Sequence, residues 1–284
     1  MKFEILGTKL SKTIFKPLHY YPVYEDYFRR LKDSYDSEKV FKLLEIGIAE
    51  GGSLELWGKI LKNMDIKYEI VGVDIDESSV DLKYDQQGIY TYLSDAKNKE
   101  TMLPILQKHF EDGANLIIDD GSHCSKDIIG AFDILFKDYL KDGGTYIIED
   151  LHTSYWEELE NDELSATNFV RNLIDAQNFW ALRDTNDRYN KTKKYHNLIR
   201  KMELYDGLVL INKGSTYQEI SDWSLHGKSQ NRLYDYSCPI GDLNLTKLIY
   251  GNHKRKSDFE LEYEECLNSD YLDLFHKNGE KNER

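Results

Sequence analysis

The stretch 115–156, in which two short apolar runs flank a helical pattern, most constrains what this chain can fold into. Residues 116–118 and 145–148 are apolar, and the apolar side chains of residues 126–140 recur at helical spacing. A strand, a helix and a second strand in this order predict two parallel strands joined by a right-handed crossover. Because ligands bind beyond the carboxyl ends of the strands in an open parallel sheet, the residues after each run are candidates for a binding site.

Acidic residues follow both of these predicted strands. The first strand ends in Asp119-Asp120, with His123 shortly after, and the second ends in Glu149-Asp150. Neighbouring strands lie about 5 Å apart, so Asp120, Glu149 and Asp150 can converge. Carboxylates held so close repel one another, and a hard divalent cation would relieve that repulsion. Oxygen ligands suit Mg²⁺ or Mn²⁺ better than zinc, although acidic residues at strand ends can also be plain loop residues or helix caps.

The composition narrows the class of partner. The 284 residues have a formal net charge of −14, which argues against nucleic acid or an anionic membrane surface, since both favour clustered Lys and Arg. Cys124, Cys238 and Cys266 have no metal-binding spacing and fit free thiols in a reducing compartment. The N-terminus lacks a long apolar segment, and no run reaches membrane-spanning length. We therefore expect a cytoplasmic protein.

Earlier strand ends predict a nucleotide-type cofactor site. Residues 41–46 are typical of a buried strand and are followed by a glycine-containing turn at 47–53 and a helix over 54–64. This order opens a Rossmann-like cofactor site, because glycine lets a ligand approach the backbone. A tight turn without any ligand would give the same pattern. Asp74 follows the strand 69–73, where a carboxylate can accept hydrogen bonds from ribose hydroxyls.

Two further segments bear on that site. Asp95 follows a short strand predicted over 89–93 and could reach the amine of an adenine, although a helix-capping aspartate would look the same. A helix over 99–110 then leads back to the acidic stretch. Ahead of the first strand, aromatic residues within 20–31 have the spacing of an amphipathic helix. Such a stripe is typical of core packing, but this one could also lid a cofactor site.

Beyond residue 156 the alternation of strands and helices stops. The polar stretch 157–197 contains a helical pattern over 166–179 and is too long for a structureless connection, so we expect a helical insertion on the binding face. Strands at 198–204 and 207–211 are joined by a tight-turn signal. The charged run 254–284 could form an amphipathic helix that packs on a partner subunit, and it predicts a homo-oligomer.

Several segments, taken together, resemble one family of enzymes. In chain order they are HYYPVYEDYF (19–28), LLEIGIAEGGSLELW (43–57), VGVDID (71–76), LIIDDGSH (116–123), YIIEDLHTSYW (146–156) and MELYDGLVLINKG (202–214). They resemble the class I S-adenosylmethionine-dependent methyltransferases, and among these the metal-dependent sugar O-methyltransferases of the mycinamicin type. The acidic segments are specific, whereas the glycine turn is not. The resemblance implies an α/β fold with a seven-stranded, mostly parallel Rossmann-like sheet, helices on both faces and an antiparallel last strand.

The resemblance also implies roles for individual residues. The histidine of the DDGSH segment, His123, would be the general base, and Asp120, Glu149 and Asp150 would coordinate Mg²⁺ or Mn²⁺. His152 is a second candidate for the base, although a loop histidine that caps the Glu-Asp turn would look the same. S-adenosylmethionine is expected to bind along Glu45, Gly47, Gly51, Ser53, Asp74, Asp95 and Asp119.

The expected organisation has three parts: an N-terminal helical segment or lid over 1–39, a methyltransferase domain over 40–215, and a C-terminal extension over 216–284. The expected function is metal-dependent O-methylation of a sugar hydroxyl, on a nucleotide-linked sugar or on a glycan or glycoside precursor. A catechol or small-phenol O-methyltransferase is the nearest alternative. An NAD-dependent enzyme would want a third glycine, which is absent, and a non-catalytic scaffold would be expected to have lost part of the acidic trio or the histidine.

Overall fold

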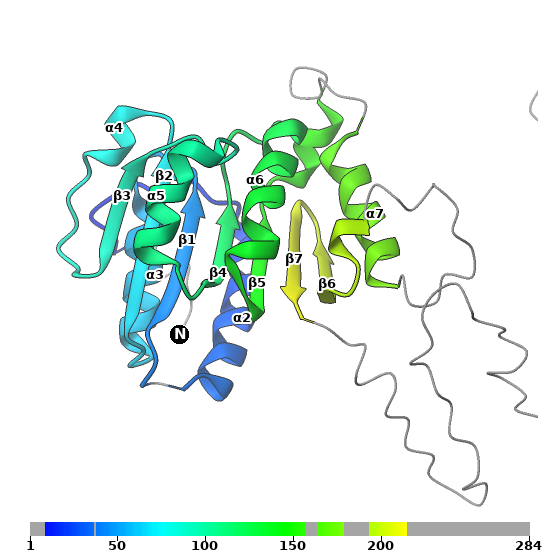
Figure 1. Ribbon diagram of the computed structural model, residues 1–284. Coiled ribbons are helices and arrows are strands. Elements are labelled where there is room, and N and C mark those ends of the chain that lie inside the picture. Colours follow the sequence, from blue (N-terminus) through cyan, green and yellow to red (C-terminus); the bar gives the residue numbers. More distant parts are fainter. Residues whose placement is uncertain (1–8, 37, 157–163, 179–192, 215–284) are drawn as a thin grey trace, which may run out of the picture. The chain divides into compact units, whose positions relative to one another are not determined.

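The computed structural model describes residues 9–36, 38–156, 164–178 and 193–214, which build one sheet with helices on its two faces (Figure 1). The sheet has seven strands in the order β3-β2-β1-β4-β5-β7-β6. The strands are β1 (Phe41–Ile46), β2 (Tyr68–Asp74), β3 (Ile89–Leu93), β4 (Ala114–Asp119), β5 (Leu140–Ile148), β6 (Ile199–Tyr205) and β7 (Leu208–Lys213). Strands β1 to β5 pair in parallel, whereas β7 is antiparallel to both β5 and β6. The predicted Rossmann-like sheet with a late antiparallel strand is therefore confirmed.

Helices occupy both faces because the apolar residues of the central strands alternate between them. The α-helices are α2 (Tyr21–Ser34), α3 (Gly52–Asn63), α4 (Glu77–Val80), α5 (Lys99–His109), α6 (Ser125–Asp138) and α7 (Ala166–Gln177), and the 3₁₀ helices are η1 (Leu18–Tyr20) and η2 (Leu151–Tyr155). Leu116 and Ile118 of β4 pack with α2 and α3. Ile117, between them, packs with α5, α6 and α7 on the opposite face. This period of two explains why the strand reads as a continuous apolar run.

The register of the central strands aligns their carboxyl ends. Ile46 of β1 pairs with Asp119 of β4, and Asp119 pairs in turn with Ile148 of β5. The residues that follow these three leave the sheet side by side. The glycine turn and both acidic clusters therefore reach the same edge, as the sequence predicts.

A two-residue turn joins β6 to β7. Tyr205 pairs with Leu208, and Asp206-Gly207 makes the turn, with Gly207 at φ 70°. Two-residue hairpins favour such left-handed positions because their twist matches that of the strands. The hairpin predicted from this Asp-Gly pair is present.

One boundary differs from expectation. Helical spacing places Leu140 in the helix after β4, but α6 ends at Asp138 and Leu140 begins β5. Leu140 pairs with Ala114, and the register shifts between Ala114 and Leu116. The early start of β5 therefore uses an irregular pairing, which apolar spacing cannot reveal.

Within the stretch expected to be an insertion, α7 buries its apolar side against the same core as α6. The rest of that stretch, at 157–163 and 179–192, and the expected C-terminal extension with Cys238 and Cys266 lie outside the described residues. The division into three parts remains a prediction. Among the described residues, no helix combines the length and apolar character needed to cross a membrane.

Candidate functional site

A cavity of about 490 Å³ opens at the carboxyl ends of β1, β2, β3 and β4. Its volume is in the range of small-molecule sites. The residues that line this cavity do not include Glu45, Gly51 or Glu149. The N-terminal segment contributes Thr13, Ile14 and Phe15 to the wall. The predicted site residues that do line the cavity are Gly47, Ser53, Asp74, Asp95, Asp119, Asp120, His123 and Asp150.

The glycine turn after β1 allows the backbone to pass close to the loop after β4. Gly47 has φ 84°, and a Cβ at this position would lie 2.1 Å from the carbonyl oxygen of Asp120. Gly51 has φ 79°, and its Cβ would lie 2.3 Å from the hydroxyl of Tyr84. Gly47 is therefore favoured both by the neighbouring backbone and by its left-handed conformation, whereas Gly51, which meets only side-chain atoms, is favoured by its left-handed conformation.

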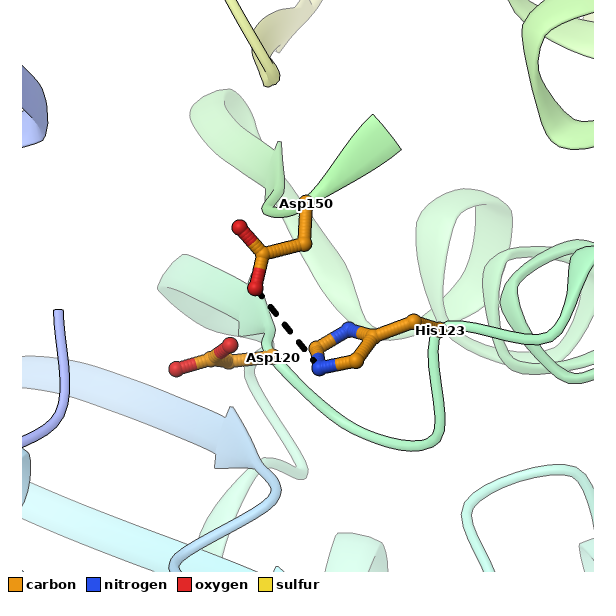
Figure 2. Close-up of side chains that lie close together, drawn as sticks. All are labelled: Asp120, His123 and Asp150. Atoms are coloured by element: carbon orange, nitrogen blue, oxygen red, sulfur yellow. Dashed lines mark ion pairs between the residues drawn. The ribbon is translucent and has the colours of Figure 1, made fainter. Parts of the chain in front are cut away.

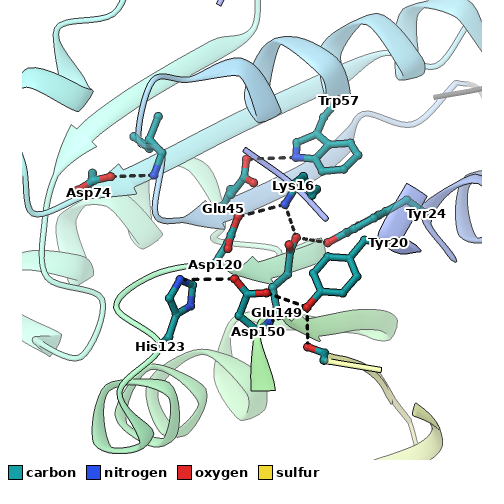
Figure 3. Close-up of polar contacts among 12 residues, drawn as sticks. Lys16, Tyr20, Tyr24, Glu45, Trp57, Asp74, Asp120, His123, Glu149 and Asp150 are labelled. Carbon is teal, nitrogen blue, oxygen red and sulfur yellow. Dashed lines mark hydrogen bonds and ion pairs between the residues drawn. The ribbon is translucent and has the colours of Figure 1, made fainter. Parts of the chain in front are cut away.

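Asp74 holds the glycine turn in place from the end of β2. Its Oδ2 accepts hydrogen bonds from the amides of Ile48 (2.8 Å) and Ala49 (3.2 Å), and its Oδ1 accepts one from the amide of Asp76 (3.0 Å). Figure 3 shows Asp74 beside the turn. The carboxylate also lines the cavity. Asp74 thus holds the conformation of the glycine turn and also forms part of the cavity wall.

Two more aspartates line the same cavity. Asp119 is buried, its Oδ2 accepts a hydrogen bond from the Tyr146 hydroxyl (3.1 Å), and burial raises its pKa to about 7. Asp95 is half-buried, and its Oδ1 accepts a hydrogen bond from the amide of Lys97 (3.1 Å). The cavity wall therefore presents carboxyl groups from the ends of β2, β3 and β4.

A lysine lies between two of the three carboxylates predicted to bind metal (Figure 3). The Nζ of Lys16 is 3.1 Å from Oδ2 of Asp120 and 2.5 Å from Oε1 of Glu149. The side chain of Lys16 is fully buried, and that of Glu149 is 1% exposed. The Tyr24 hydroxyl donates a further hydrogen bond to Glu149 Oε1 at 2.5 Å. Glu149 therefore points into the protein, toward α2 and away from the cavity.

Burial and charge act in opposite directions on this pair. Burial lowers the pKa of Lys16, but the carboxylates of Glu149 and Asp120 outweigh burial and raise that pKa above its ordinary value. Burial raises the pKa of Glu149 above its ordinary value, against the opposing charge of Lys16. The ammonium is thus held charged by the acidic groups around it.

Glu45 belongs to this buried cluster. Its side chain is fully buried, and its Oε2 accepts a hydrogen bond from Nε1 of Trp57 (3.1 Å). Burial raises the pKa of Glu45 to about 8, against the opposing charge of Lys16. Glu45 therefore lies in the protein interior and does not line the cavity.

The cavity side of the acidic centre is formed by Asp120, His123 and Asp150, whose candidate ligand atoms lie within 4.8 Å of one another (Figure 2). Nε2 of His123 is 3.6 Å from Oδ2 of Asp150. The hydroxyl of Tyr20 donates a hydrogen bond to Oδ1 of Asp150 at 2.7 Å. His152 flanks Asp150 at 4.0 Å, but its side chain is 45% exposed and is not among the residues lining the cavity.

These donors suit a hard divalent cation. The predicted set consists of carboxylate oxygens, which Mg²⁺ and Mn²⁺ prefer. The ammonium of Lys16 stands in for a cation between Asp120 and Glu149. The structure brings Asp120 and Asp150 together on the cavity side, whereas the carboxylate of Glu149 contacts Lys16 and Tyr24 (Figure 3).

Three residues that contact the acidic centre are not predicted by the sequence: Lys16, Tyr20 and Tyr24. The two tyrosines belong to the aromatic stripe before the first strand. That stripe predicts core packing or a lid over the cofactor site, and does not predict contact with the carboxylates. Lys16 lies in a stretch without periodicity. A search for a basic residue to balance the converging carboxylates is the one argument that could have found it.

The sheet order, the glycine turn and the acidic strand ends define the fold of the class I S-adenosylmethionine-dependent methyltransferases. No model of a known protein family matches the sequence. The curated relatives that it matches are O-methyltransferases.

Two of these relatives illustrate the similarity. The mycinamicin VI 2''-O-methyltransferase of Micromonospora griseorubida is 32% identical over 188 residues, which cover 60% of this chain and 43% of the relative. The demethylmacrocin O-methyltransferase of Streptomyces fradiae is 29% identical over 211 residues, which cover 69% and 49%. The chain spans about half the length of the curated relatives it matches.

Among solved structures, the MycE methyltransferase of the mycinamycin pathway, in complex with Mg and SAH, superposes with a TM-score of 0.61. The sequence identity is 26%, and the match covers 76% of this chain and 54% of MycE.

Proposed function

We propose that this protein is an S-adenosylmethionine-dependent, divalent-metal-dependent O-methyltransferase that acts on a sugar hydroxyl. The observation that carries the proposal is the convergence of Asp120, His123 and Asp150 on the wall of the cavity that the glycine turn also lines. The names of the relatives and the Mg and SAH bound by MycE support the choice of cofactor, metal and acceptor.

The cofactor would lie along the glycine turn. Gly47 and Ser53 line the cavity at this turn, so backbone and hydroxyl groups are available to the methionine part of the cofactor. Asp74 and Asp95 line it at the ends of β2 and β3, where they would accept hydrogen bonds from ribose hydroxyls and from the adenine amine. Asp119 would complete the wall. Glu45 and Gly51, which do not line the cavity, would support the turn from behind.

The acidic centre would hold Mg²⁺ or Mn²⁺ through Asp120 and Asp150, which meet on the cavity side. Glu149 would be the third ligand once Lys16 no longer occupies its Oε1. A bound divalent ion supplies positive charge that acidifies and orients a nearby hydroxyl. Tyr20 fixes Asp150 and Tyr24 fixes Glu149 by hydrogen bonds. Such outer partners orient the ligands of metal sites, so α2 and its preceding turn would set the geometry of two of the three ligands.

His123 would act as the general base. When bound, S-adenosylmethionine would supply an electrophilic methyl group to the acceptor oxygen and would leave as the neutral thioether. The proton of the hydroxyl passes to the neutral ring of His123, which lines the cavity. Oδ2 of Asp150, 3.6 Å from Nε2, would help to position the ring at the edge of the cavity.

The sugar acceptor would approach from the side of Asp150. Tyr155 and Trp156, which follow this residue in the chain, are 70% and 50% exposed. Aromatic rings at this edge offer a surface on which a sugar or an apolar aglycone can stack. The acceptor is proposed to be a nucleotide-linked sugar or a glycan or glycoside precursor, with a catechol as the alternative of the same metal-dependent class.

An acceptor screen tests the proposal. The full chain is incubated with labelled S-adenosylmethionine and Mg²⁺ together with nucleotide sugars, glycosides or catechol, and methylated product and S-adenosylhomocysteine are measured. Transfer to a sugar hydroxyl, lost in Asp120→Asn, is the expected result. Transfer to catechol alone would reassign the acceptor class. Absence of cofactor binding by calorimetry would reject the methyltransferase assignment.

We further propose that the protein acts in the cytoplasm as a homo-oligomer and does not bind nucleic acid. The acidic net charge of −14 supports the last point. Light scattering coupled to gel filtration measures the assembly, and a mobility-shift experiment with duplex and single-stranded DNA tests nucleic-acid binding. A monomeric mass or a salt-sensitive shift would contradict these assignments.

A further inference from the structure

Lys16 is enclosed like a bound cation. Besides its contacts with Asp120 and Glu149, its Nζ lies 5.7 Å from the ring centroid of Tyr24 and 5.8 Å from that of Trp57. The ammonium is thus surrounded by carboxylates and by the faces of two aromatic rings, both favourable to positive charge. The side chain of Lys16 is fully buried, so it is not a solvated surface group. Its ammonium occupies a place where the two carboxylates favour a cation.

The same two oxygens cannot hold Lys16 and a divalent ion together. Mg²⁺ bonds to carboxylate oxygens at about 2.0–2.1 Å. An ion bound by both Asp120 Oδ2 and Glu149 Oε1 would occupy nearly the space of an Nζ that is 3.1 and 2.5 Å from them. Two positive charges in one buried space also repel strongly. Occupancy by the ion and occupancy by Lys16 therefore exclude each other.

We propose that Lys16 is a built-in competitor for the metal: the ammonium occupies the Asp120–Glu149 pair when no divalent ion is bound and leaves when one binds. This inference rests on the proposed function, because it assumes that Asp120 and Glu149 are metal ligands. It assigns to Lys16 a role in setting metal affinity and in protecting the acidic centre from self-repulsion before the metal arrives.

The exchange also reaches the cofactor cavity, because Lys16 lies on a segment that forms part of its wall. This N-terminal strap, residues 9–17, is held at its other end by Glu55, which accepts hydrogen bonds from the amides of Ser11 and Lys12. Between these anchors the amide of Gly52 donates to the carbonyl of Thr13 (3.0 Å). Departure of Lys16 releases the strap at one end, next to the wall residues at 13–15, and links metal loading to the shape of the cavity.

Calorimetric titration of Mg²⁺ into the 284-residue chain tests the competition. Lys16→Met keeps a long apolar side chain but removes the charge, so the ion no longer has to break two charge-assisted contacts. We expect metal affinity to rise by roughly 10- to 100-fold. Lys12→Met is the matched control: Lys12 is on the same strap, but its Nζ lies over the Tyr84 ring at 5.0 Å. Its affinity for Mg²⁺ should match that of the wild type.

A second measurement uses the wild type and needs no variant. A water-soluble amine-acetylating reagent is applied with and without Mg²⁺, and modification of each lysine is followed by mass spectrometry. Lys16, fully buried without the ion, should become reactive when the ion binds. Lys213, another buried lysine whose Nζ donates to the carbonyls of Lys137 and Leu140, should stay protected in both states.

The outcomes separate this inference from the proposed function. Equal Mg²⁺ affinity in the wild type and Lys16→Met, together with a Lys16 that stays protected when the ion is bound, would overturn the competition and leave a metal-dependent enzyme. Failure of both proteins to bind Mg²⁺ or Mn²⁺ would overturn the competition and the metal dependence together.

Discussion

His123 and Asp150 face each other across the edge of the cavity, with Nε2 and Oδ2 3.6 Å apart, although they come from loops after different strands (Figure 2). Both residues have left-handed backbone, at φ 61° and 52°. Non-glycine residues adopt this conformation at a cost, and such strain is concentrated at functional sites. The hydroxyl of Thr153 donates to the carbonyl of His123 (3.1 Å) and ties the two loops together. The pair is thus positioned by the backbone of both loops.

This geometry leads to the first prediction, which concerns the general base. His123→Ala should lower kcat by roughly 10²- to 10⁴-fold, the usual contribution of general acid–base catalysis. Cofactor and metal affinity should change little, because neither is proposed to depend on the ring. Steady-state kinetics and calorimetry measure the two effects. His152→Ala is the matched control, and if it proves the more damaging change, the base has been misassigned.

The second prediction concerns the cofactor. Asp74→Ala removes the carboxylate proposed to bind the ribose and also frees the amides of Ile48 and Ala49. Affinity for S-adenosylhomocysteine should fall by roughly tenfold or more, as for the loss of hydrogen bonds to a charged group. Asp81→Ala is the control, since Asp81 follows α4 and is not among the residues lining the cavity. Unchanged calorimetric affinity in Asp74→Ala would disprove this role.

Removal of the metal gives the third prediction. Activity should disappear after treatment with a chelator and return on addition of Mg²⁺ or Mn²⁺, because the proposed donors are carboxylate oxygens. Zn²⁺ should restore less activity, since it prefers nitrogen and sulfur ligands. The measurement is methyl transfer before and after metal depletion, with the residual metal determined by mass spectrometry. Full turnover by metal-free protein would contradict the assignment.

The fourth prediction tests the reason for the glycine after β1. An alanine at position 47 would place its Cβ 2.1 Å from the carbonyl oxygen of Asp120, and the position has φ 84°. Gly143 has a similar φ of 80°, but a Cβ at that position would have nothing within 4 Å. Gly143→Ala should therefore cost about 1 kcal/mol, the penalty of left-handed backbone alone.

Gly47→Ala should cost at least about 1 kcal/mol more, because the overlap must also be relieved. Urea denaturation of the two variants measures the difference in the free energy of unfolding. Equal stabilities would show that the turn accommodates a side chain and that its glycine has to be explained by a ligand.

The sheet and one half of the acidic centre could be predicted from the sequence because they depend on local pattern. Apolar runs of strand length ended by Asp119-Asp120 and Glu149-Asp150 locate two neighbouring strand ends, and parallel pairing brings them together. Lys16 could not be predicted in this way. It is separated from Asp120 by 104 residues and from Glu149 by 133, and no periodicity of its segment indicates which group it meets.

The different partners of Glu149 and Asp150 could also not be predicted from the sequence. Adjacent residues within a strand point to opposite faces, but both residues lie beyond the end of β5 and Asp150 has left-handed backbone, so this rule does not fix where their side chains go. Only the structure shows that Glu149 is buried against Tyr24, whereas Asp150 reaches His123.

The last prediction concerns the pH dependence of folding stability and Glu45. Burial raises the pKa of its carboxyl from the ordinary value of 4.5 to about 8. Below pH 4.5 the carboxyl is protonated in the folded and unfolded states alike, so its ionisation does not lower the free energy of unfolding there. Between these two values the unfolded chain ionises while the folded protein keeps the proton, and stability falls as pH rises.

Glu45→Gln removes this titration and keeps an acceptor for the indole of Trp57. In metal-free protein, the free energy of unfolding of the variant relative to the wild type should therefore rise from pH 5 to pH 8, as the wild type loses stability through this window. Urea denaturation at several pH values measures this difference, and a difference that stays constant across the window would mean that Glu45 is ionised in the folded protein.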